Sequence, residues 1–98
     1  MTSARHTRRL LVRGRVQGVG FRYATVRAAQ RFGITGWVRN RRDGSVEAVV
    51  HGSAAAVEAI VAWARRGPDS AIVESLEVVE VEMETQGEFA SFETRPTE

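Results

Sequence analysis

The sequence predicts a small α+β domain in which one antiparallel sheet carries two helices on one face. Short runs with strand-like apolar patterns alternate with two stretches whose apolar residues recur at helical spacing. Their order, β-α-β-β-α-β, is that of the split βαβ, or ferredoxin-like, arrangement. The 98 residues suffice for a single hydrophobic core, so we expect one domain over residues 1–98. Its ordered core should span about residues 7–95, since chain ends tend to fray.

The first strand and the first helix enclose a glycine-rich loop. Thr7–Arg13 is an apolar-bearing run that ends at Gly14, as expected for a strand. After the loop, the apolar residues of Arg22–Phe32 recur at helical spacing, and Gly33 follows where a C-cap glycine is common. We therefore expect a strand, a loop and a helix in this order.

A hairpin and a second helix follow. Thr35–Arg41 and Val46–His51 are expected to pair, because the Arg42–Ser45 segment between them contains an Asp-Gly turn signal. Ser53 is a favourable N-cap residue, and Gly67 with the proline after it should end the helix. One helical stripe of apolar residues lies in between, at Val57, Ile60, Val61 and Ala64.

Two further strands complete the predicted fold. Ile72–Glu84 is rich in valine and glutamate and should form a long strand. After a Gln86-Gly87 turn, Ala90–Arg95 should form a last short strand. Aromatic side chains are expected to pack in or at the edge of the core, namely those of Phe21, Phe32, Trp37, Trp63, Phe89 and Phe92.

The composition excludes several classes of function. The chain has no cysteine, so disulfides, thiolate chemistry and cysteine metal sites are excluded. It has no apolar run long enough to span a membrane and no signal-type apolar segment, so we expect a cytoplasmic protein. All 14 basic residues are arginines, and the net charge is +2. The basic balance makes nucleic-acid binding a hypothesis to weigh.

The segment Gly14–Arg22, GRVQGVGFR, suggests a site for one phosphate group. Gly18 and Gly20 permit the left-handed backbone that turns N–H groups inward, and the following helix N-terminus adds partial positive charge. Arg22 can bind the same anion through its guanidinium group. A glycine-rich connection without a ligand is the alternative. The spacing matches neither the dinucleotide-binding nor the Walker fingerprint.

Two motifs resemble the signatures of a known family. Val12–Arg22, VRGRVQGVGFR, is similar to the first signature of the acylphosphatases. Gly36–Gly52, GWVRNRRDGSVEAVVHG, is similar to the second. Both motifs are intact in order and spacing, and the resemblance extends over nearly the whole chain, from Thr7 to Arg95. The predicted β-α-β-β-α-β order is also the fold of that family.

The resemblance implies an enzyme that hydrolyses acyl phosphates to a carboxylate and inorganic phosphate without a cofactor. In this family, loop amides and the motif arginine bind the phosphate, and the motif asparagine positions the attacking water. The corresponding residues here are Gln17, Gly18, Val19, Gly20 and Phe21 for the amides, Arg22 for the arginine and Asn40 for the asparagine. For Asn40 to reach the loop, we expect its strand to lie beside the first strand.

The implied chemistry needs few protein groups. A carboxylate leaves without a general acid, because its conjugate acid has a pKa of about 4–5. Phosphoryl transfer depends on positioning and charge stabilisation, which Arg22 and the amides can supply. We expect a bound phosphate oxygen to accept the proton of the water. No metal is expected, because the only histidines, His6 and His51, lack a metal-ligand spacing.

Alternatives to this hypothesis stay open at the level of sequence. The leading hypothesis is a free, monomeric acylphosphatase with a small acyl phosphate as substrate and no nucleic-acid or membrane partner. A nucleic-acid-binding module would need aromatic side chains on the outer sheet face, where only Trp37 is a candidate. A catalytically idle phosphate-binding domain is a third hypothesis. A module of a large carbamoyl-phosphate-using enzyme is less consistent with the absence of zinc-finger cysteines and with the end at Glu98.

Overall fold

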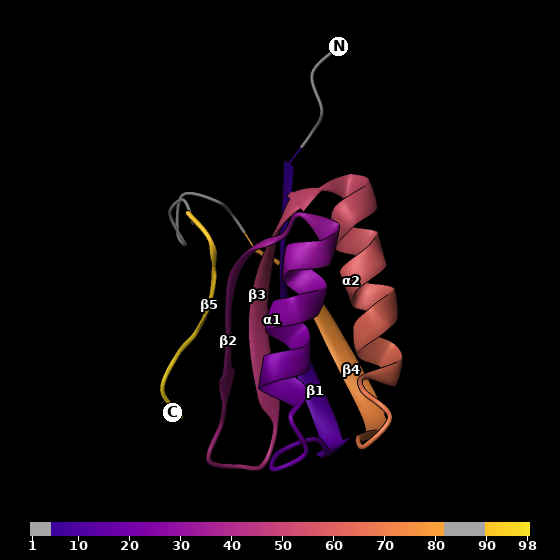
Figure 1. Ribbon diagram of the computed structural model, residues 1–98, viewed down its shortest axis with the longest axis vertical. Helices are drawn as coiled ribbons and strands as arrows, with labels where there is room; N and C mark the ends of the chain where they lie inside the picture. Colours follow the sequence, from indigo (N-terminus) through magenta and orange to yellow (C-terminus); the bar gives the residue numbers. More distant parts are fainter. Residues whose placement is uncertain (1–4, 82–89) are drawn as a thin grey trace.

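A computed structural model of the chain describes residues 5–81 and 90–98. Figure 1 shows a sheet with both helices on one face, as predicted for this α+β fold. Among the described residues, no helix is long and apolar enough to cross a membrane. The elements are β1 (Arg5–Arg15), α1 (Phe21–Phe32), β2 (Thr35–Asn40), β3 (Val46–Ser53), α2 (Ala54–Arg66), β4 (Ile72–Glu80) and β5 (Phe92–Thr94).

The five strands lie in the order β4-β1-β3-β2-β5. The first four form antiparallel pairs, as the sequence predicts. The last strand differs, because β5 pairs parallel to β2 at the far edge, with Phe92 opposite Gly36. The sheet is therefore mixed at this edge. The backbone N–H of Arg95 also donates to the carbonyl oxygen of Val38 at 2.9 Å, which continues this contact beyond β5.

The first strand is longer than predicted, and Gly14 lies within it rather than at its end. The register of β1 against β4 shifts between Arg13 and Gly14, after which Gly14 pairs with Val73. Gly14 has φ 132°, and a Cβ atom there would collide with the carbonyl oxygen of Ile72. This glycine therefore permits the close approach of β1 and β4 and is not part of the anion loop.

Several local signals have the predicted structures. The Oγ of Ser53 accepts a hydrogen bond from the N–H of Ala56 at 3.2 Å and caps α2. Gly33 ends α1 with φ 72°, in the left-handed region. The predicted continuation of β4 over residues 82–84, the Gln86-Gly87 turn and Phe89 lie outside the described residues.

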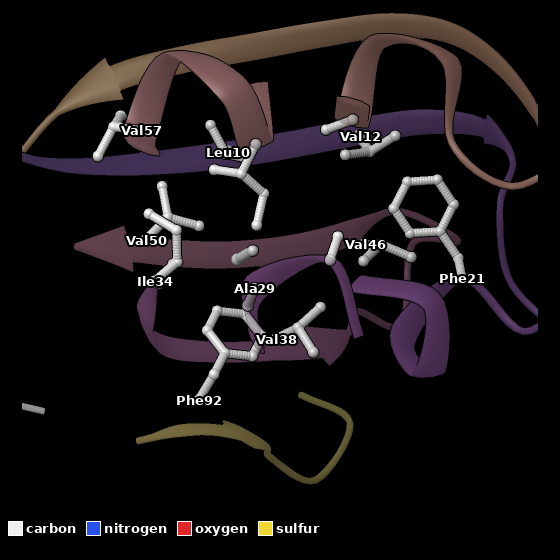
Figure 2. Close-up of a cluster of buried hydrophobic side chains, with 14 of the residues drawn as sticks. Leu10, Val12, Phe21, Ala29, Ile34, Val38, Val46, Val50, Val57 and Phe92 are labelled. Carbon is white, nitrogen blue, oxygen red and sulfur yellow. The ribbon is translucent and has the colours of Figure 1, made fainter. Parts of the chain in front are cut away.

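The hydrophobic core lies between the sheet and the two helices (Figure 2). Val38 points into this core, so its strand neighbour Trp37 faces the opposite side of the sheet. Trp63 lies at the core edge and packs on Phe21 with ring centroids 5.6 Å apart. The most deeply buried members of the core include Leu10, Val12, Val16, Ala29, Val38, Val46, Val50 and Ile60.

Candidate active site

The loop between β1 and α1 takes a backbone that requires glycine. Gly18 has φ 75° and Gly20 has φ 80°, both in the left-handed region that other L-residues disfavour. A Cβ atom at either position would meet nothing within 4 Å, so the requirement is conformational rather than steric. Helix α1 begins directly after Gly20, with no side-chain cap and no acidic residue in its first turn. Its first N–H groups lack intrahelical acceptors and can therefore bind an anion.

Arg22 is the second residue of α1 and lies at this helix N-terminus. Its side chain is half-buried. Within residues 5–81 and 90–98, it forms no ion pair or side-chain hydrogen bond. The guanidinium charge is therefore not neutralised by a described acidic side chain, and it can form two parallel hydrogen bonds to a phosphate.

Asn40 is the last residue of β2. Its side-chain oxygen, Oδ1, is buried and has no hydrogen-bond partner among the described residues. A buried amide oxygen normally accepts a hydrogen bond, so an unpartnered one is a feature of interest at a candidate site.

The strand of Asn40 does not lie beside the first strand, so that expectation was wrong. Strand β3 lies between β1 and β2, and residue Val46 of β3 pairs with Val12 on one side and with Asn40 on the other. Because β1 and β2 are both antiparallel to β3, they run in the same direction, and their C-terminal ends lie at the same end of the sheet. Figure 1 shows the loop after β1 and the turn after β2 at this common end.

Arg22 and Asn40 line the same cavity, of about 400 Å³. Four other lining residues are not among the predicted site residues, namely Val16, Tyr23, Val26 and Thr94. Val26 lies one helical turn after Arg22, a spacing that could have indicated it. Thr94 had no such signal, because it reaches the cavity through the parallel pairing of β5. The described residues that line the cavity are Val16, Gly18, Gly20, Phe21, Arg22, Tyr23, Val26, Asn40 and Thr94.

Gln17 and Val19 are not among these lining residues, although their backbone amides were predicted to bind phosphate. The side-chain Nε2 of Gln17 donates to the carbonyl oxygens of Arg41 at 2.6 Å and of Ser45 at 2.8 Å. These two residues flank the turn of the β2–β3 hairpin. Gln17 therefore connects the glycine loop directly to the segment that follows Asn40.

Glu47 forms a cluster with three arginines on the sheet face opposite the helices. Its carboxylate accepts hydrogen bonds from Arg9 at 2.5 Å, Arg39 at 2.8 Å and Arg41 at 3.0 Å. The Glu47 side chain is only 4% exposed. Burial alone would raise the pKa of Glu47, but the hydrogen bonds from the three arginines outweigh it and lower the pKa below 4.5. The charge of Arg41 is therefore committed to Glu47 rather than to a ligand.

We expect Glu47→Gln to destabilise the fold by about 2 kcal/mol at neutral pH, because three arginines would then face each other without their carboxylate. The lowered pKa means that ionised Glu47 stabilises the fold above its unfolded value of 4.5. This contribution disappears as the pH falls through the folded value. Urea unfolding from neutral to acid pH should thus show a shallower acid decline in Glu47→Gln. The exposed Glu58 provides the control, since Glu58→Gln should leave both stability and its pH dependence unchanged.

Comparison with known proteins identifies the family. A family model described as Acylphosphatase matches residues 8–94. The chain belongs to the acylphosphatase family. A curated acylphosphatase of Thiobacillus denitrificans (strain ATCC 25259 / T1) is 54% identical over 89 residues, which cover 91% of this chain and 96% of that protein. The resemblance of the two sequence motifs is thereby confirmed.

Solved structures show the same fold in acylphosphatases. The acylphosphatase of Coxiella burnetii has a TM-score of 0.86 and 30% sequence identity, with 93% of each chain covered. Full-length HypF has a TM-score of 0.88 and 25% identity, but the match covers 99% of this chain and only 13% of that protein. This chain is thus an enzyme that acts on small acyl phosphates, and its similarity to these two acylphosphatases extends over more than 90% of its length.

Proposed function

We propose that the backbone amides of Gln17–Phe21 and the guanidinium of Arg22 bind the phosphoryl group, and that Asn40 positions the attacking water. This assignment of roles is supported by one observation: Arg22 and Asn40 line the same cavity at the uncapped N-terminus of α1. Among the described residues that line this cavity, Arg22 alone is charged. A dianionic phosphoryl group would therefore meet a cation and helix N–H groups at one end, and an amide side chain at the other.

The hydrolysis proceeds in a single displacement at phosphorus. The oxygen of water forms a bond to phosphorus while the bond from phosphorus to the acyl oxygen breaks. The electron pair of that bond leaves with the carboxylate, and the proton of the water passes to a phosphate oxygen. Arg22 and the loop amides stabilise the charge on the phosphoryl oxygens without moving, because the loop conformation fixes them before the substrate binds.

Asn40 contributes direction rather than charge. Its buried Oδ1, which lacks a partner among the described residues, can accept a hydrogen bond from the water. A water held in this way approaches phosphorus in line with the leaving carboxylate. Such orientation removes a large part of the activation barrier in comparable reactions.

Phosphate release from benzoyl phosphate in the presence of a metal chelator tests this proposal. We expect full turnover, with inorganic phosphate as a competitive inhibitor, because the phosphate product occupies the loop and Arg22. Turnover that disappears with chelator, or phosphate inhibition that is not competitive with substrate, would contradict the proposed roles.

Gly20→Ala should weaken phosphate binding, because alanine in the left-handed region costs about 1–2 kcal/mol and shifts the loop amides. The KM for benzoyl phosphate and the inhibition constant of phosphate should rise together by about tenfold. Gly20→Asn should show a smaller effect, since asparagine adopts this conformation more readily and the site has room for a Cβ atom. Equal losses in the two variants would show that the backbone conformation of Gly20 is not the cause.

We also propose that the enzyme acts as a monomer without a nucleic-acid partner. Trp37, the candidate aromatic residue for nucleic-acid stacking, is only 5% exposed, and the guanidinium groups of Arg39 and Arg95 each lie 4.7 Å from its ring centroid. It therefore offers no free ring face to a base. Exposed carboxylates along β4 disfavour pairing of this edge with a second copy, namely those of Glu74, Glu77 and Glu80.

A further inference from the structure

We propose that the Gln17 side chain is a positioning residue that sets the distance between the phosphate-binding loop and Asn40. This inference rests on the proposed roles of the loop and of Asn40. The amide nitrogen of Gln17 donates to Arg41 and Ser45, which are 24 and 28 positions away in the sequence. An amide has two N–H donors, so both are used in these contacts. One side chain thus joins the two motifs of the active site.

The acceptors of Gln17 belong to a turn that is held by hydrogen bonds of its own. The N–H of Arg41 donates to the carbonyl of Ser45 at 2.8 Å, and the N–H of Gly44 donates to the carbonyl of Arg41 at 3.1 Å. The Oδ1 of Asp43 accepts hydrogen bonds from the N–H of Ser45 at 2.9 Å and from its hydroxyl at 2.6 Å. These hydrogen bonds from Ser45 lower the pKa of Asp43 to about 2, so the Asp43 carboxylate stays ionised, and able to accept them, at all but strongly acid pH.

Gln17 binds the residue next to Asn40 in the sequence, so one peptide bond separates Asn40 from this contact. Arg41 directly follows Asn40, so fixing the Arg41 carbonyl limits how far the Asn40 backbone can move relative to the loop. On its other edge, the Asn40 carbonyl accepts a hydrogen bond from the N–H of Glu98 at 3.1 Å. The N–H of Arg42 donates in turn to the backbone oxygen of Glu98 at 3.0 Å. The backbone at Asn40 is therefore held from the loop side and from the C-terminal side.

This arrangement requires a hydrogen-bond donor at position 17. Methionine has a similar length and volume but cannot donate to the two carbonyl oxygens. Glutamate has the same shape, yet its ionised carboxylate would face two carbonyl oxygens and repel them. A protonated glutamate has one O–H donor and would restore part of the contact.

The decisive experiment compares Gln17→Met with the wild type in kcat, KM and the inhibition constant of inorganic phosphate. A misplacement of Asn40 should lower kcat by about 10- to 100-fold and leave phosphate inhibition nearly unchanged. In an Asn40→Ala background, Gln17→Met should then have no further effect on kcat, since the residue that it positions is gone. Gln30→Met on the exposed face of α1 is the matched control and should behave as wild type.

Gln17→Glu provides a second readout, which does not depend on the folding of the methionine variant. The ratio of its kcat to that of the wild type should rise as the pH falls and the carboxyl group becomes protonated. Three results would overturn the inference: an equal loss of kcat with and without Asn40, a parallel loss of phosphate binding, or a ratio for Gln17→Glu that is independent of pH. A parallel loss of phosphate binding would assign Gln17 to the shape of the loop alone and would leave the proposed role of Asn40 intact.

Discussion

Arg22→Ala is expected to impair both phosphate binding and turnover strongly in this acylphosphatase. No other described residue that lines the cavity carries a charge, so none of these side chains can replace the guanidinium. Its loss should lower kcat/KM by about a thousandfold, as for removal of a principal charge-stabilising group. The affinity for inorganic phosphate should fall by about 10- to 100-fold, because hydrogen bonds to charged groups contribute about 1.5–3 kcal/mol. Steady-state kinetics and phosphate titration by calorimetry measure the two effects.

Two further variants separate the shape of Arg22 from its charge. Arg22→Lys keeps the positive charge but loses the planar pair of donors, so it should recover phosphate binding only in part. Arg31→Ala removes an arginine from the last turn of the same helix, where the guanidinium stacks on Phe32, and should leave kinetics unchanged. Retention of wild-type phosphate affinity in Arg22→Ala would show that the loop amides suffice and that Arg22 has another role.

Asn40→Ala is expected to lower kcat by about 100- to 1,000-fold. In other enzymes, removal of one fixed polar side chain that stabilises the transition state has an effect of this size. Phosphate binding should stay close to that of the wild type, because Arg22 and the loop amides are unchanged. The two variants therefore differ in a simple way: Arg22→Ala loses binding and turnover, whereas Asn40→Ala loses turnover alone. Competitive inhibition by inorganic phosphate, measured beside kcat, distinguishes them.

The control for this variant is Gln30→Ala, which removes an amide side chain from the exposed face of α1. We expect its kcat and its phosphate inhibition to equal those of the wild type. A near-normal kcat in Asn40→Ala would rule out the proposed role of Asn40 in holding the water. A loss of phosphate affinity equal to the loss of kcat would instead place Asn40 among the phosphate ligands.

The sequence predicts those parts of the fold that depend on local chemistry. Ser53 and Gly33 mark helix ends because their preferences are set within one turn of the chain. The Asp43-Gly44 pair predicts the hairpin turn for the same reason, since Gly44 has φ 95°. The two motifs also bring Arg22 and Asn40 into one candidate site, and the structure places both on one cavity.

The remaining features depend on contacts between distant segments. The parallel pairing of β5 with β2 is decided at the sheet edge, and no pattern in Phe92–Thr94 specifies it. Gly14 looked like part of the loop because only the approach of β4 reveals its role. The side chain of Gln17 was overlooked because its acceptors are backbone carbonyls, which carry no residue-specific signal. Its amide was predicted, but its connection to the hairpin required the tertiary structure.

The most direct test of the proposed site is the fate of the water oxygen. Benzoyl phosphate is hydrolysed in water labelled with the heavy isotope of oxygen, and both products are analysed by mass spectrometry. If Arg22 and the loop hold the phosphoryl group while Asn40 directs water to phosphorus, the label appears in inorganic phosphate and not in benzoate. Label in benzoate would mean that water attacks the acyl carbon, and it would contradict the proposal that this cavity holds phosphorus as the reacting centre.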